Sequence, residues 1–97
     1  MPAREAPEEV AGNDPLARAI VLLEAGAWQQ AHEIVQHETS ALAEWLHGIV
    51  HTLEGDLDNA RYWYRRVDRV FPGPDAVVEE IAAARRTAQG GAEPGRA

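Results

Sequence analysis

Apolar residues recur along much of the chain at intervals of three and four, the spacing of helices that turn one face toward a core. Five segments show this pattern, and turn or breaker residues separate them. They span residues 15–25, 27–38, 41–54, 57–71 and 75–88. We therefore predict an all-α fold with five helices and no strands.

Capping and breaking residues define the ends of these segments. Asp14 followed by Pro15 is typical of a helix start, because the carboxylate can cap the first turn and proline fits its first position. Gly26, the Gly-Asp pair at 55–56 and the Pro-Gly-Pro stretch at 72–74 mark the later turns.

The predicted core residues form one stripe on each of the last three helices, at i, i+3, i+4 and i+7 positions. On the third helix they are Leu42, Trp45, Leu46, Ile49, Val50 and Leu53. On the fourth they are Leu57, Ala60, Trp63, Tyr64, Val67, Val70 and Phe71, and on the fifth Val77, Val78, Ile81, Ala84 and Ala88.

The first two predicted helices repeat in the next two. Leu16 aligns with Leu46 at an offset of 30 residues, and after a one-residue deletion Gly26 aligns with Gly55 at an offset of 29. An internal repeat of this kind is typical of stacked helical hairpins. We therefore predict two antiparallel hairpins, with the fifth helix as a C-terminal capping helix.

Residues 55–72, GDLDNARYWYRRVDRVFP, resemble the turn and second helix of a tetratricopeptide repeat. The matching positions are Gly55, Leu57, Ala60, Tyr64, Val67 and Pro72. The stretch GAWQQAHEIV resembles the same motif more weakly, with Trp28 and Ala31 in register. The chain is also similar to a small, uncharacterised and mostly bacterial family of helical proteins. The first resemblance implies a tetratricopeptide-like array.

Composition limits the chain to one small domain. Residues 1–13 and 89–97 are rich in Pro, Gly, Ala and Glu, so we expect disordered tails around a single domain at 14–88. Because a domain of this size has a marginal core, self-association or packing against a partner is expected. No stretch has the length of a membrane span and the N-terminus lacks an apolar signal core, so we expect a cytoplasmic protein.

Charge is distributed unevenly along the 97 residues, which carry a net charge of −7. The acidic balance disfavours nucleic acid and anionic membranes as partners. Between Arg18 and Arg61 the chain has seven acidic residues, all four histidines and no basic residue. Arginines then follow in quick succession, so the fourth predicted helix is the basic one.

Tyr62 points away from the apolar stripe of the fourth helix, among Arg65, Arg66 and Arg69. Exposed Tyr and Arg side chains are common in binding hot spots, so these four residues are the candidate partner-binding surface. Two alternatives stay open. The arginines can pair with the acidic helices of the same chain, or Tyr62 can stack on a nucleic-acid base.

A polar stripe with metal-ligand chemistry lies along the third predicted helix, at spacings of three, four and three. It consists of Glu44, His47, His51 and Glu54. Histidines at i and i+4 can chelate one divalent ion. A further ligand would come from His32 or Glu33 on the second helix. The alternatives are a solvated face, helix-to-helix hydrogen bonds, or a pH-sensitive interface.

The sequence contains few residues that could carry out other catalytic chemistry. The stretch HEIVQH is no zinc-protease motif, because His32 and His37 are five residues apart and diverge by about 140° on a helix. The chain has no Cys and no Lys, which excludes thiol nucleophiles and a P-loop. The single serine, Ser40, lies where a helix N-cap explains it. No catalytic residue is assigned.

Two functions follow as expectations. The first is a non-enzymatic helical-repeat module that binds a protein partner or a second copy as a homodimer, because a short array has an open end to bury. It needs no cofactor. The alternative is a divalent-metal protein or small metal-dependent enzyme. Its ligands would be His47 and His51, with one of His32, Glu33, Glu44 and Glu54.

Overall fold

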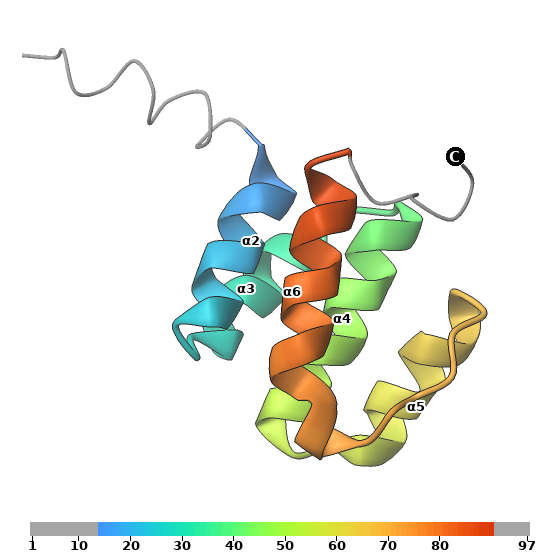
Figure 1. Cartoon of the computed structure of the whole chain (residues 1–97). Helices are drawn as coiled ribbons and strands as arrows, with labels where there is room; N and C mark the ends of the chain where they lie inside the picture. The colour runs from blue at the N-terminus through green and yellow to red at the C-terminus, as the bar shows by residue number, and fades with distance from the viewer. Residues whose placement is uncertain (1–13, 91–97) are drawn as a thin grey trace, which may run out of the picture.

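Five α-helices and one short 3-10 helix form the fold in the computed structural model, which describes residues 14–90 (Figure 1). They are α2 (Pro15–Glu24), α3 (Trp28–Val35), α4 (Ala41–Glu54), α5 (Leu57–Arg66), η1 (Pro74–Ala76) and α6 (Val77–Ala88). The prediction of an all-α fold is confirmed. The predicted N-terminal tail, residues 1–13, lies outside the described residues. So do residues 91–97 of the predicted C-terminal tail. Among the helices of residues 14–90, none is long and apolar enough to cross a membrane.

Side-chain caps start three of the helices. The Asp14 carboxylate accepts hydrogen bonds from the first turn of α2, as predicted. Ser40 caps α4 by accepting from the Ala43 amide at 3.1 Å, and Asp56 caps α5 by accepting from the Asn59 amide at 3.3 Å. These caps satisfy backbone amides that have no partner within the helix.

The end of α5 differs from the prediction. Asp68 adopts a left-handed conformation with φ 61°, its amide donates to the Arg65 carbonyl, and the Arg69 amide donates to the Tyr64 carbonyl. This pair of bonds closes the helix as a Schellman motif. The helix therefore stops at Arg66, five residues before the predicted end. Val70, predicted to be core, is 89% exposed because it lies beyond the helix.

The helices pair as two hairpins, α2 with α3 and α4 with α5, and α4 also packs against α3. The C-terminal helix α6 lies against α2 and α4, so it covers both hairpins on one side (Figure 1). A connection of ten residues, 67–76, brings the chain from the end of α5 to the start of α6.

The central helix α4 is surrounded by neighbours. Every residue from 45 to 52 is buried, including the polar ones. Gly48 allows α5 to come close, since a Cβ atom at this position would lie 2.7 Å from Cδ1 of Tyr64. Ala60, the small residue of the repeat motif, is fully buried at the same contact. The spacing between α4 and α5 is thus set by side chains of minimal size.

Two polar side chains of α6 attach it to the rest of the fold. Glu80 accepts hydrogen bonds from Tyr64 Oη at 2.7 Å and from Trp45 Nε1 at 3.1 Å. Burial and the adjacent Glu80 carboxylate raise the pKa of Tyr64, which keeps the hydroxyl a donor. Arg85 donates two hydrogen bonds to Glu24 on α2, at 2.6 and 2.7 Å.

Candidate metal site

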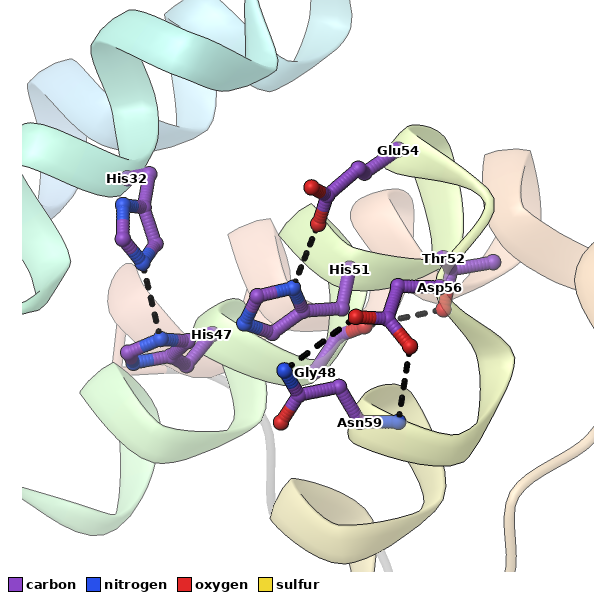
Figure 2. A network of polar contacts seen from close by, with 8 residues as sticks. All are labelled: His32, His47, Gly48, His51, Thr52, Glu54, Asp56 and Asn59. Atoms are coloured by element: carbon purple, nitrogen blue, oxygen red, sulfur yellow. Dashed lines mark hydrogen bonds and ion pairs between the residues drawn. The ribbon is translucent and has the colours of Figure 1, made fainter.

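Three histidines converge between α3 and α4 (Figure 2). His32 Nε2 lies 3.1 Å from His47 Nε2, and the His51 ring lies 5.0 Å from that of His47 between centroids. Each histidine offers one ring nitrogen, and these three nitrogens lie within 4.8 Å of one another. We call this group the histidine cluster. It contains the two predicted residues of α4 and one of the two candidates predicted on α3.

The packing of α3 against α4 creates the cluster. His47 and His51 are one helical turn apart, so they lie on the same face of α4. Helix α3, which comes before α4 in the chain, packs against α4. His47 is 8% exposed and His51 is 9% exposed. A solvated polar face, one of the alternatives from the sequence, is therefore wrong for these two histidines, whereas Glu54 of the same stripe is exposed. A helix-to-helix histidine contact, another of those alternatives, is present.

An aromatic side chain from α5 closes one side of the cluster. Trp63 stacks on the His47 ring with a centroid distance of 3.9 Å and an interplanar angle of 8°. The sequence placed Trp63 in the repeat core, and its contact with a histidine was not predicted. The sequence contained a signal for this contact, because Trp63 belongs to the apolar face of α5 that packs on α4. The indole fixes the plane of the His47 ring.

Glu54 orients the third histidine. His51 Nδ1 lies 2.7 Å from Glu54 Oε1, so the carboxylate accepts the Nδ1 proton, and in a neutral ring Nε2 is then the nitrogen with a free lone pair (Figure 2). Asp56 lies close to the same pair and belongs with His51 and Glu54 to a second, more exposed group of metal-ligating side chains. Its carboxylate already caps α5 through Asn59.

Burial keeps the centre of the cluster neutral. Burial is the main cause that lowers the pKa of His47 to about 4; the neighbouring imidazoles of His32 and His51 act in the same direction, and Glu44 opposes them. Near pH 7 the His47 ring is therefore uncharged. Among residues 14–90, every buried side-chain nitrogen and oxygen has a hydrogen-bond partner. Within the cluster, one hydrogen bond joins His32 to His47, and a second joins His51 to Glu54.

The remaining predicted ligands lie outside the cluster. Glu44 accepts a hydrogen bond from Arg66 at 2.8 Å, which lowers the pKa of the carboxyl group. Glu33 is exposed and accepts from the Gln36 amide group at 3.4 Å. His37 is also exposed, outside the cluster that contains His32. The structure thus separates Glu44 and Glu33 from the three histidines.

The predicted partner-binding residues are largely engaged within the chain. The Arg66 guanidinium pairs with Glu44 and lies 5.4 Å from the Trp63 ring, and that of Arg69 lies 3.4 Å from the Trp45 ring. These contacts agree with the alternative that the arginines pair inside the fold. Tyr62 is 44% exposed, and Arg65 is exposed as well. Arg66 and Arg69 are exposed too, so all four side chains keep the accessibility that a binding surface needs.

A shallow depression of about 510 Å³ adjoins the cluster on the α3 side. Its lining residues are Trp28, Gln29, Gln30, His32, Glu33 and Glu54. It reaches one histidine of the cluster and the carboxylate that orients another. Solvent therefore approaches the cluster from this side.

The chain has no match among protein-family models, curated proteins or solved structures. The resemblance to a tetratricopeptide repeat therefore stays a prediction from the sequence.

Proposed function

We propose that this chain is a metal-binding helical protein whose histidine cluster holds one divalent transition-metal ion, with zinc as the first choice. The observation that carries the proposal is the convergence of His32, His47 and His51 from two helices on one point. Neutral imidazole nitrogens suit zinc, nickel and copper, whereas magnesium and calcium favour oxygen ligands.

The distance between two of the three ligand nitrogens suits an ion of this size. Two nitrogens bound to a tetrahedral zinc at 2.0–2.1 Å are about 3.3 Å apart. The two Nε2 atoms of His32 and His47 are 3.1 Å apart. One of them carries the proton of their hydrogen bond, so binding requires that proton to leave or to move to Nδ1. The ion then replaces a shared proton between the same two atoms.

The surroundings of the ligands support the proposal further. Histidines that bind a metal commonly donate their other ring N–H to a carboxylate, which fixes the ring and strengthens it as a ligand. His51 and Glu54 form this pair at 2.7 Å. Trp63 restrains the His47 ring in a similar way by stacking. Both restraints exist before any ion binds, which lowers the entropy cost of binding.

The test is the thermal melting of tag-free protein, stripped with EDTA and then titrated with Zn²⁺, Ni²⁺ or Mn²⁺. An ion at 100 times its dissociation constant should add about 2.7 kcal/mol to the free energy of unfolding. For a domain of this size that equals a rise in Tm of about 10–20 °C. His51→Ala should lose the rise, and His37→Ala, an exposed histidine outside the cluster, should keep it.

Two results would refute the proposal. The first is an unchanged Tm with all three ions, together with no heat of binding in calorimetry. The second is a rise in Tm that persists in His51→Ala and vanishes in His37→Ala, which would place the ion elsewhere.

A protein-interaction module is the second candidate, favoured by the exposure of Tyr62 beside Arg65. Aromatic and Arg side chains with this accessibility are frequent in hot spots. The partner would be another protein or a second copy of the chain. Light scattering of the wild type and of Tyr62→Ser tests the second case, since the variant should dissociate a dimer held by this surface. A monomer in both excludes the homodimer.

A further inference from the structure

The depression beside the histidine cluster leads to the side of the cluster that the fold leaves open. Of the three histidines only His32 lines it, and Glu54 stands at its other edge. The remaining sides are covered, because His47 and His51 are buried in α4 and Trp63 lies flat on the His47 ring. A molecule in the depression can therefore reach the cluster without displacing the core.

Three protein ligands leave a position free on a tetrahedral ion. Structural zinc sites fill all four positions with side chains, whereas sites with three protein ligands keep one for water or another molecule. Glu54 is already engaged by His51, and Glu33 is directed to the Gln36 amide group. In this conformation neither carboxylate is a free fourth ligand.

We propose that the fourth position of the ion is filled from the depression by a neutral imidazole group, either a free one or a histidine side chain of a peptide. This inference rests on the proposed metal site and assigns the ligand class of that site. Its basis is the chemistry of the depression, which combines an aromatic wall, amide groups and negative charge.

The carboxylates select against anions. Glu33 and Glu54 both line the depression, and their two negative charges offset the attraction of the divalent ion for a small anion. An uncharged nitrogen donor meets no such repulsion. Once an imidazole binds an ion through one nitrogen, its second ring nitrogen is an N–H donor, for which a carboxylate is a good acceptor.

The other lining residues suit a flat ring. Trp28 offers an aromatic surface on which an imidazole can stack or pack edge-on. Gln29 and Gln30 provide amide oxygens and N–H groups at the mouth of the depression. Its volume of about 510 Å³ exceeds what one imidazole occupies, so a short peptide that presents a histidine also fits.

The experiment uses the full-length, tag-free protein loaded with Co²⁺, whose visible absorption reports the ligands around the ion. At about pH 8, where most free imidazole is neutral, the loaded protein is titrated with imidazole, with acetyl-Gly-His-Gly-amide and with azide. Imidazole should change the spectrum with a dissociation constant at least about tenfold below that of azide, a difference of about 1.4 kcal/mol. A peptide that acts at equal or lower concentration than imidazole assigns the ligand to a peptide histidine, and a weaker peptide assigns it to a free imidazole.

Two variants separate charge from shape. Glu33→Gln should tighten azide binding about threefold or more, because it removes one negative charge from the rim, and should leave imidazole binding within about twofold, because the amide keeps an oxygen that can accept the imidazole N–H. Gln30→Trp should weaken imidazole by filling the depression while Co²⁺ affinity is unchanged. Both residues lie outside the histidine cluster and are exposed, so neither variant should disturb the fold.

The outcomes distinguish the two proposals. Absence of a cobalt spectrum overturns the metal site and this inference with it. A cobalt spectrum that imidazole and the peptide leave unchanged overturns only the inference. Azide that binds more tightly than imidazole overturns the charge selection, and so does a Glu33→Gln variant with wild-type azide affinity.

Discussion

Acidification should destabilise the metal-free protein through His47. Its pKa is about 4 in the folded state, because the ring is buried beside two other imidazoles, against about 6.5 for an unperturbed histidine. The unfolded chain therefore binds more protons than the folded protein between these two values. The contribution of His47 to stability is complete above about pH 6.5 and is lost as the pH falls toward 4.

The expected magnitude follows from the two pKa values. Between about pH 8 and pH 5 the linkage relation gives a loss of about 2 kcal/mol, rising to about 3 kcal/mol at pH 4. For a domain of this size, 2 kcal/mol lowers Tm by about 8–16 °C. The window above pH 5 separates this effect from the carboxyl groups. The pKa values of Glu24 and Glu44 are lowered by their arginine partners, so their contributions are lost only in more acidic solution.

The assay is urea unfolding in EDTA at a series of pH values, for the wild type and for His47→Gln. The variant should be less stable at pH 8, since it loses the stacking on Trp63, but its stability should change less with pH. His37→Gln, a substitution at an exposed histidine, is the matched control and should retain the wild-type slope. Equal slopes for wild type and His47→Gln would refute the assignment of the pH dependence to His47.

Three further predictions concern neighbouring contacts. Gly48→Ala should lower the free energy of unfolding by about 1–2 kcal/mol in urea unfolding, because the new Cβ would lie 2.7 Å from the Tyr64 ring. The cost of this overlap exceeds what the higher helix propensity of alanine contributes, and a gain of about 1 kcal/mol would contradict the prediction. Glu80→Ala should cost about 2 kcal/mol, since it removes the acceptor of Tyr64 Oη, and Glu80→Gln should cost less; equal losses would show that the acceptor is irrelevant. Glu54→Gln should weaken Zn²⁺ binding about tenfold in calorimetry through His51, and unchanged affinity would exclude its orienting role.

Local sequence signals predicted most of the fold, but they failed where an unusual backbone conformation decides. Gly55 was predicted to end α4, and it does so with φ 95°. The predicted end of α5 was wrong, because the apolar pattern continues to Phe71 although the helix stops earlier. It stops where Asp68 adopts the left-handed conformation, which glycine normally adopts. A pattern of side chains carries no information on a single unfavourable backbone angle.

The ligands of the candidate site were predictable, and their environment was not. The spacing of His47 and His51 places them on one face, and the hairpin repeat brings His32 opposite them. Their burial depends on how closely α5 and α3 approach α4. For α5 that distance is set by Gly48 against the Tyr64 ring, and it also brings Trp63 onto His47. No signal within a single helix reveals such a distance.

The position of α6 has a consequence for how the domain unfolds. In a linear repeat array each hairpin contacts only its neighbours, so hairpins can unfold one at a time. Here Arg85 binds Glu24, 61 residues earlier, and Glu80 binds side chains of α4 and α5. Loss of either hairpin therefore removes part of the surface that holds α6. The five helices should melt in one cooperative transition, whereas a chain that stops before α6 should lose this coupling between its two hairpins.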